Sequence, residues 1–475
     1  MKHTNHLLRY GSYVFSIAGA RTAGILISSA TFPYLVRKLG VQGYGYWSYV
    51  IAVCAFLTVL SDPGLTTFLT QQLAAHREHA FDCIVDVLFL RLMSSAIAGI
   101  ILLLVVSLEI RTEVRFLLKL YGLGILFVNL LSCDYILTAL EMFHFRSVLT
   151  VAQQSAYALG IFAFVRSSAD IKWVALSILL SSSLTALIGW TILLRRGVKL
   201  RARLRPRSWR GILVPSTHYA ASTLMSSIYH RTGHLIVRWM LGDFALGIYA
   251  AATRFVDLLR GFVTIVLQVL MPRIAFASQS GQGVRKLAKV ALAGISIVSI
   301  PLCAGLIATS HLLVPWLMGT AYTADISLLR WVAPYLVTAP AASLFAGTIL
   351  FAMGRHRAYL AATAVGAACG VILNFVLTPW IGLIGAALAF VLAEVAVAGV
   401  AFAKVPELWD SWRSPAIAAS VVALLPMLLA VRVANAYTSQ VGVVIVSGAC
   451  FYIAVCGWFV RRLVSRESFG VVAGN

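Results

Sequence analysis

Acidic residues are scarce in this chain, and so are charges in general. Of 475 residues, 16 are Asp or Glu, and charged residues together make up 11%, whereas soluble domains average about 25%. Hydrophobic residues make up 60%. A soluble fold of this composition would expose most of its apolar surface to water. Because no stretch is polar enough to cover a separate domain, we expect one membrane-embedded body.

Sequence motifs of several enzyme and metal classes are also missing. The seven cysteines are scattered, without a CxxC pair, which excludes a zinc site or a disulfide framework of the usual spacing. There is no P-loop, dinucleotide-binding fingerprint or nucleophile elbow. We therefore expect neither a metal nor a resident cofactor, and no ATP hydrolysis within this chain.

Long apolar runs dominate what is present. A membrane helix needs about 20 mostly apolar residues. Fourteen runs meet this requirement: 11–35, 46–71, 84–107, 116–139, 148–166, 173–194, 213–239, 245–271, 287–309, 326–352, 359–377, 382–403, 415–433 and 440–460. The sequence predicts an all-α membrane protein of about fourteen transmembrane helices.

Basic residues outnumber acidic ones by 38 to 16. In a soluble chain this excess would suggest nucleic acid, but here the cations lie mainly between apolar runs, so no nucleic acid is expected. Their densest group runs from Arg195 to Arg210. Since connections rich in Lys and Arg stay in the cytoplasm, the pattern predicts a multi-pass membrane protein with both termini cytoplasmic.

A short pattern recurs in the two halves. Residues 39–47 and 241–249 both read Leu-Gly, four residues, Gly, one residue and an aromatic, and they lie 202 residues apart. Parallel repeats are a known transporter plan, so two pseudo-symmetric lobes are expected. The expected parts are an N-terminal lobe (1–194), a basic cytoplasmic linker (195–212), a C-terminal lobe (213–403) and two extra helices with a cytoplasmic tail (404–475).

Several ionisable residues fall inside apolar runs, where each costs about 2.5–3.5 kcal/mol on insertion scales. Arg21 lies in the first run, and Arg254, Asp257 and Arg260 share about 120° of the eighth helix. Asp257 is expected to orient Arg254 and can neutralise only one of the two arginines. The surplus cation suits a phosphate; the alternative is a set of ion pairs between helices.

The seventh helix also has a polar face. His230, Arg231, His234 and Arg238 fall within about 100° of arc. The two histidines have metal-ligand spacing but no third ligand, so the wall of an aqueous cavity is the favoured interpretation. For Arg238, a side chain that reaches the membrane interface is expected.

Acidic side chains within the spans are candidates for ion pairing or coupling. Asp62 precedes Pro63 and Gly64, and this helix breaker predicts a kink that exposes polar backbone. Asp257 and Glu394 are the other candidates. Whether a proton or Na⁺ drives transport, or neither, stays open.

Three segments carry a family resemblance: "FPYLVRKLGVQGYGYWSY" with "LSDPGLTTFLTQQLA", "LGIYAAATRFVDLLRGFVTIVLQVLMPRIA", and "LNFVLTPWIGLIGAALAFVLAE". In order and spacing they resemble the Wzx-type polysaccharide and O-antigen flippases of the multidrug/oligosaccharidyl-lipid/polysaccharide (MOP) exporter superfamily. The resemblance implies two six-helix lobes around a cavity that opens alternately to each side.

It also implies the substrate, a polyprenyl-diphosphate-linked oligosaccharide, and as partners the membrane lipids and the polymerase and chain-length proteins of the same pathway. Related flippases carry important arginines in their first and eighth helices, which hold Arg21 and Arg254 here. These two are expected to hold the diphosphate jointly. Relatives often have Asp where this chain has Gly233, which removes one coupling candidate.

Three other functions stay open. A lipid II flippase is a close alternative, and a cation-coupled antiporter of the MATE type would favour acidic rather than cationic cavity residues. An integral-membrane glycosyltransferase or polymerase would place its catalytic groups on a long outer loop. The longest outer connection, 310–325, has no paired carboxylates, so an enzyme is not expected.

Overall fold

The computed structural model describes residues 2–75, 83–198, 204, 206, 209–280, 283–412, 415–438 and 440–472. Throughout these ranges the regular structure is helical, without strands. Ten of the described helices are long and apolar enough to cross a membrane, and a bent pair, Thr320–Val332 with Tyr335–Leu350, makes an eleventh. The expectation of an all-α membrane protein is confirmed.

Three of these helices are each two spans joined at a glycine. About 20 residues already cross the hydrocarbon, whereas these helices have 60, 72 and 48 residues. Gly40, Gly242 and Gly382 interrupt them with φ of 68°, 86° and 61°, a region that favours glycine. Counting each half separately gives the fourteen expected spans among the described residues. The three are α1 (Lys2–Ser61), α10 (Trp209–Ser280) and α14 (His356–Ala403).

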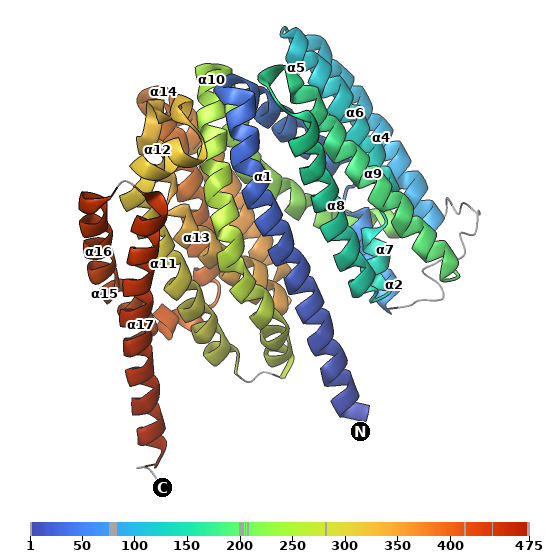
Figure 1. The fold of residues 1–475 in the computed structure, drawn as a ribbon. Coiled ribbons are helices and arrows are strands. Elements are labelled where there is room, and N and C mark those ends of the chain that lie inside the picture. The colour runs from blue at the N-terminus through green and yellow to red at the C-terminus, as the bar shows by residue number, and fades with distance from the viewer. Residues whose placement is uncertain are drawn as a thin grey trace. The chain divides into compact units, whose positions relative to one another are not determined.

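Two compact units make up the chain, residues 1–247 and 248–475. In the first unit α8 packs against both α1 and α9, and α4 packs against α1 and α6 (Figure 1). Its other elements are α2 (Leu65–Ala75), α4 (Cys83–Leu108), α5 (Thr112–Leu117), η1 (Leu118–Gly122), α6 (Leu123–Leu131), α7 (Asp134–Ala139), α8 (Phe143–Phe164), η2 (Ser168–Asp170) and α9 (Ile171–Arg195).

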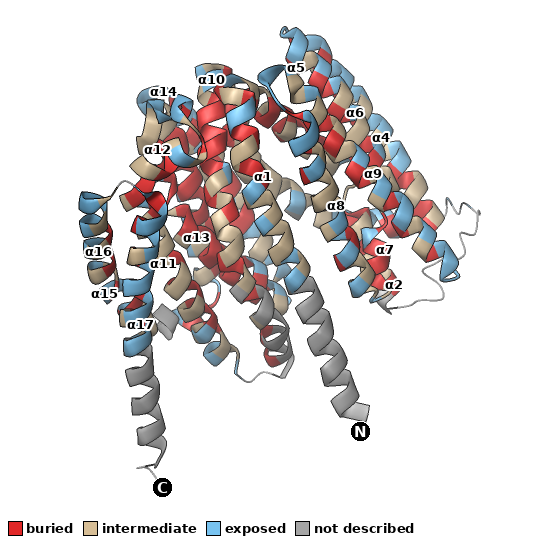
Figure 2. Cartoon of the chain, in the orientation of Figure 1, coloured by how far each residue is buried: buried red, intermediate tan, exposed pale blue. Residues whose placement is uncertain are grey.

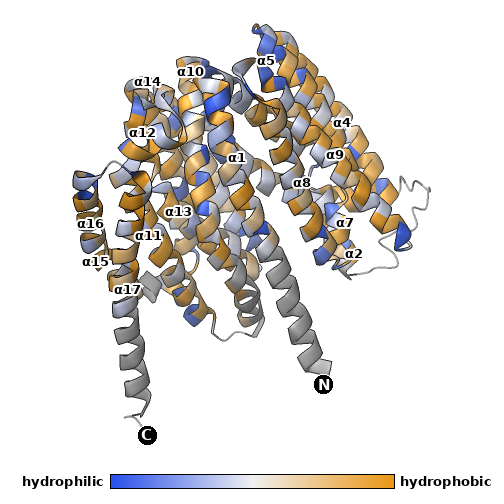
Figure 3. Cartoon of the chain, viewed as in Figure 1, coloured by the Kyte–Doolittle hydropathy of each residue, from blue (hydrophilic) through white to orange (hydrophobic). Residues whose placement is uncertain are grey.

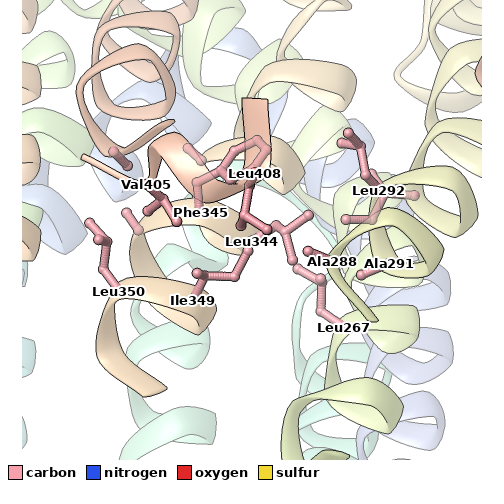
Figure 4. Close-up of a cluster of buried hydrophobic side chains, with 14 of the residues drawn as sticks. Leu267, Ala288, Ala291, Leu292, Leu344, Phe345, Ile349, Leu350, Val405 and Leu408 are labelled. Carbon is pink, nitrogen blue, oxygen red and sulfur yellow. The ribbon is translucent and has the colours of Figure 1, made fainter. Parts of the chain in front are cut away.

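The second unit is organised around α11, which packs against α12, α13 and α17. Figure 4 shows its core, where side chains of α10, α11 and η5 meet Val405 and Leu408. Its elements after α10 are α11 (Val284–Leu317), η4 (Thr320–Asp325), α12 (Ile326–Val332), α13 (Tyr335–Ala342), η5 (Ser343–Leu350), α14, η6 (Pro406–Trp412), α15 (Pro415–Val422), α16 (Leu424–Tyr437) and α17 (Val441–Val472).

The outward faces of the helices are apolar, as a lipid-facing surface requires. Figure 2 shows exposed residues along α4 and α9, and Figure 3 shows that much of this surface is hydrophobic. Ile97, Ile100 and Leu104 of α4 are 59–61% exposed, and Leu180 of α9 is 66% exposed. Such patches mark a surface that meets lipid rather than water.

The boundary between the two units falls within α10, just after Gly242. The predicted lobes, 1–194 and 213–403, stay a prediction, because units defined by contacts need not coincide with pseudo-symmetric halves. Part of the basic segment 195–212, the predicted linker, lies outside the described residues.

The recurring Leu-Gly pattern has a structural cause in the first unit. A Cβ atom on Gly45 would collide with the carbonyl of Asp243, and one on Gly247 would collide with the carbonyl of Val41. The two contacts are equivalent under the repeat, because Gly45 and Gly247 are 202 residues apart and so are Val41 and Asp243. The repeated glycines therefore let two helices cross with their backbones in contact, as small residues do in membrane helix packing.

Alanine at either glycine is expected to destabilise the fold. Gly45→Ala and Gly247→Ala place a methyl group against backbone, which cannot rotate away, and overpacking costs about 1–3 kcal/mol. The check is the melting temperature in detergent. Gly399→Ala, on an exposed helical position with no atom within 4 Å of its Cβ, is the matched control. Equal melting temperatures in all three variants would contradict the close crossing.

Candidate functional site

Two spans of the first unit are interrupted at their polar residues. The second span is helical up to Ser61 and becomes helical again at Leu65. Gly64, in the break, has a φ of 76°. Asp62 accepts a hydrogen bond from the Thr66 amide at 3.1 Å. The kink predicted at Asp62 is confirmed, and its carboxylate satisfies a backbone donor of the new helix. The fourth span breaks similarly, between α6 and α7.

Arg91 of α4 lies where these two breaks meet. Its side chain is fully buried, with Nε 3.9 Å from Asp62 Oδ2. Nη2 donates to the carbonyl of Asn129 and, at 3.2 Å, to Ser132 Oγ, and the guanidinium lies 5.4 Å from the Tyr135 ring. A buried cation thus pairs with a backbone carbonyl near the end of α6, as broken membrane helices require. Arg91 was not predicted as a site residue, although it lies within the apolar run 84–107, as Arg21 lies within the first run.

Removing Arg91 is expected to destabilise the protein strongly. Arg91→Gln leaves Asp62 as a poorly exposed charge without its cation, and breaking a buried pair from one side costs about 3–5 kcal/mol. Adding Asp62→Asn should recover part of the lost melting temperature. Arg166→Gln, on an exposed residue, should stay near wild type. Independent, additive effects of the Arg91 and Asp62 changes would contradict the pairing.

A second group, here called the Arg238 cluster, comprises Tyr49, Glu109, Arg111, Arg238 and Asp243. Arg238 donates from Nη1 and Nη2 to the two Glu109 oxygens at 2.8 and 3.0 Å, and from Nε to Asp243 Oδ1 at 2.6 Å. Its guanidinium lies 3.6 Å from the centroid of the Tyr49 ring. Its side chain is 14% exposed, because two carboxylates hold it, and the expectation that it reaches the membrane interface stays a prediction.

Arg111 and Glu109 extend this cluster into the connection between α4 and α5. Arg111 Nη1 pairs with Asp243 Oδ2, while 46% of the Arg111 side chain stays exposed. Burial would raise the pKa of Glu109, but the hydrogen bonds and charge of Arg238, helped by the Arg111 amide, hold that pKa below its usual value. Glu109 is therefore ionised at neutral pH and binds Arg238 as a carboxylate.

Sequence reasoning missed Glu109 and Asp243. The first follows the third apolar run directly, and the second follows the second Leu-Gly pair. Both positions can be seen in the sequence, but a count of only Lys and Arg in the connections leaves out the acidic residues there.

A cavity of about 630 Å³ adjoins the cluster and is lined by Arg111, Arg238 and Asp243 together with apolar side chains of α1, α4 and α10.

The other candidates of the first unit lie on α1 and α10. Arg21 is exposed, midway between the start of α1 and Gly40. On α10, His230 and Arg231 are half-buried and His234 is buried, and the rings of Tyr229 and His230 have centroids 3.9 Å apart. The roles assigned to these residues stay predictions.

The second unit brings Arg254, Asp257 and Arg260 together, and we call them the Arg254 cluster. Arg260 Nε and Nη2 lie 2.9 and 2.8 Å from Asp257 Oδ1, whereas Arg254 Nη1 lies 3.8 Å from Oδ2. Asp257 therefore holds Arg260 more closely than Arg254, which corrects the expectation that it mainly orients Arg254. Both arginines lie three residues from Asp257, but only the guanidinium of Arg260 comes within hydrogen-bond distance of its carboxylate.

Two further side chains contact this cluster. The Arg260 guanidinium lies 5.6 Å from the Tyr335 ring, and buried Glu394 of α14 interacts electrostatically with Arg260. Arg254 itself keeps 48% of its side chain exposed. Near the middle of a membrane helix, an exposed guanidinium needs water or an anion beside it. The cluster can thus hold an anionic group at Arg254 while Asp257 fixes Arg260.

Comparisons with known proteins identify the family and the fold of the chain. Residues 11–278 match the family described as polysaccharide biosynthesis protein. A candidate O-antigen transporter of Escherichia coli (strain K12) is 22% identical over 396 residues, which cover 81% of this chain and 94% of that protein.

Solved structures resemble the fold at low identity. The lipid II flippase MurJ in an inward closed conformation superposes with a TM-score of 0.73 at 15% identity, over 95% of this chain and 99% of that one. An inward-facing multidrug-resistance MATE transporter of the MOP superfamily gives 0.60 at 18% identity, over 85% of this chain and 99% of that one. This likeness establishes the two-lobe MOP fold for the chain.

Proposed function

We propose that this chain, which belongs to the polysaccharide biosynthesis protein family and has the MOP fold, flips a polyprenyl-diphosphate-linked oligosaccharide from the cytoplasmic to the outer leaflet. It does so by alternating access and without catalysing a covalent reaction. Its product supplies cell-surface polysaccharide synthesis, in which polymerase and chain-length proteins are the expected partners.

The observation that carries this proposal is the exposed arginine in the middle of a membrane helix. Arg254 lies more than two turns from both Gly242 and the end of α10 and is half exposed. A diphosphate that leaves water needs fixed cations, and the guanidinium offers paired N–H groups that match phosphate oxygens. Arg21, also exposed midway along its helix, supplies a second cation, and the polar face of His230, Arg231 and His234 provides donors for sugar hydroxyls.

Glu394 gives the proposed site a way to couple to protons. When ionised, Glu394 and Asp257 balance the two arginines of the Arg254 cluster; when Glu394 is protonated, one positive charge is left for the substrate. We therefore assign Glu394 as the coupling group, in preference to Na⁺ binding. Glu394→Gln should transport without dependence on a pH gradient. Export by this variant that still follows the gradient would contradict the assignment.

Both termini and the segment around Arg205 are proposed to lie in the cytoplasm of the inner membrane, because the densest positive segments stay inside. Reporter tags inserted after residue 205 and at the C-terminus should both give a cytoplasmic signal. A periplasmic signal from either tag would contradict this orientation.

The test of the function is the intermediate that accumulates when the protein is depleted. A diphosphate-linked oligosaccharide of complete repeat length should accumulate on the cytoplasmic side while surface polysaccharide falls. Accumulation of lipid II instead would assign the protein to the second candidate function, a lipid II flippase, which the fold likeness to MurJ favours. Incomplete sugar chains would indicate a glycosyltransferase.

A further inference from the structure

The cavity beside the Arg238 cluster has two chemically different ends. Its apolar wall is formed by residues of α1, α4 and α10, and its polar end, here called the mouth, is formed by charged residues of the cluster. Its volume of about 630 Å³ lies within the 300–1,000 Å³ typical of ligand sites. The apolar wall includes Val53, Phe56, Leu57, Leu60, Ile101 and Val105.

The mouth lies at the level of lipid headgroups. Trp239, which lines it, is 75% exposed, and Trp is enriched where a membrane meets water. Arg111 follows the end of α4, and Gly242 marks the end of a span in α10. The apolar wall extends from there along α1 and α4 into the depth of the hydrocarbon. The cavity therefore runs from the headgroup region into the acyl-chain region.

One cation at the mouth is available to a ligand. Arg238 is engaged with Glu109 and Asp243 through all three of its guanidinium nitrogens. Arg111 contacts Asp243 through Nη1 and keeps 46% of its side chain exposed. Its remaining N–H groups can donate to the oxygens of a phosphate, for which the guanidinium fork is well shaped.

We propose that this cavity binds an anionic phospholipid of the bilayer, with an acyl chain against the apolar wall and the phosphate at Arg111. A free phosphate would leave the wall empty, and a sugar would find no polar partners there. The bound lipid would join the α4–α5 connection to the Gly242 break of α10 and so stabilise the Arg238 cluster. This inference requires only that the protein is embedded in a membrane and does not depend on the transported substrate.

The experiment measures lipid binding to the delipidated full-length protein by native mass spectrometry. The probes are dioleoylphosphatidylglycerol, dioleoylphosphatidylcholine and undecaprenyl phosphate. For the wild type we expect phosphatidylglycerol to bind about tenfold more tightly than phosphatidylcholine. Arg111→Gln should remove that preference, and Arg111→Lys should keep part of it, because lysine retains the charge without the fork.

A second variant tests the apolar wall independently. Leu60→Trp, at a position 41% exposed, should fill the cavity and weaken binding of both phospholipids. Leu103→Trp, on α4, 52% exposed and not part of the lining, is the matched control and should bind as the wild type does. Melting temperatures without lipid show whether each variant is folded; if Arg111→Gln is not, Arg111→Lys and Leu60→Trp decide.

Three results would overturn the proposal. One is equal binding of the two phospholipids to the wild type. Another is an undiminished phosphatidylglycerol preference in the folded Arg111 variants, or undiminished binding of both phospholipids to Leu60→Trp. The third is selective binding of undecaprenyl phosphate that phosphatidylglycerol does not displace, which would assign the cavity to the carrier lipid.

Discussion

Arg254→Ala is expected to reduce polysaccharide export at least about tenfold, with a normal amount of protein in the membrane. A charge-assisted hydrogen bond contributes about 1.5–3 kcal/mol, and about 1.4 kcal/mol already corresponds to a factor of ten. Arg254→Lys should fall between wild type and alanine, because lysine keeps the charge but loses the paired donors. Arg21 should follow the same order, and the double alanine variant should be inactive.

The assay is complementation of a flippase-deficient strain, scored by surface polysaccharide and normalised to membrane protein. Arg357→Ala, on an exposed arginine of the same unit, is the matched control and should export normally. Asp257→Asn should weaken export without eliminating it, because Arg260 loses its closest partner while Arg254 keeps its charge. Full export by a stably expressed Arg21→Ala plus Arg254→Ala variant would show that these arginines are bystanders.

Arg238→Gln is expected to lower the melting temperature more than removal of its carboxylate partner does. The substitution leaves Glu109, 8% exposed, without its cation, while Asp243, 2% exposed, keeps only Arg111. Breaking a buried pair from one side costs about 3–5 kcal/mol. Glu109→Gln should cost less, because Asp243 still balances Arg238. The variant that combines Arg238→Gln with Glu109→Gln should lose less melting temperature than the sum of the two single losses.

The pH dependence gives an independent check of the same pair. The pKa of Glu109 is lower in the folded protein than its ordinary value of 4.5. Its stabilisation is therefore fully present above that value and is lost as the pH falls through the lower, folded value. The difference in melting temperature between wild type and Glu109→Gln should persist at neutral pH and shrink in acid. A difference that stays constant down to the acid limit of stability would contradict the ion pair.

The fold could be predicted from the sequence because the bilayer leaves few alternatives. Spans of about 20 apolar residues must be helical, so the run lengths alone predicted the fourteen spans. The repeated Leu-Gly pattern also predicted related connections, which the structure places at Gly40 and Gly242. The reciprocal contact of Gly45 and Gly247 could not be predicted, because the pattern does not say which helices cross.

The polar sites were harder to predict, because they depend on contacts between distant segments. Asp62 was identified as a break, but its proximity to Arg91 depends on how α4 packs against α1. For Arg238, the sequence does not show that Glu109, 129 residues away, binds its guanidinium. Contacts within one helix were predicted more fully: Arg254, Asp257 and Arg260 do meet, although Asp257 holds Arg260 more closely than Arg254.

The central claim is that this protein moves a diphosphate-linked oligosaccharide across a bilayer, and purified protein in sealed proteoliposomes tests it most directly. The vesicles contain the lipid-linked oligosaccharide in their inner leaflet only, and a membrane-impermeant lectin reports the fraction that reaches the outside. We predict that the exposed fraction rises with wild-type protein, rises at least about tenfold more slowly with Arg254→Ala, and stays at the protein-free level with the Arg21→Ala plus Arg254→Ala variant. An exposed fraction with wild-type protein equal to that of protein-free vesicles, across an imposed pH gradient of either direction, would contradict the flippase account.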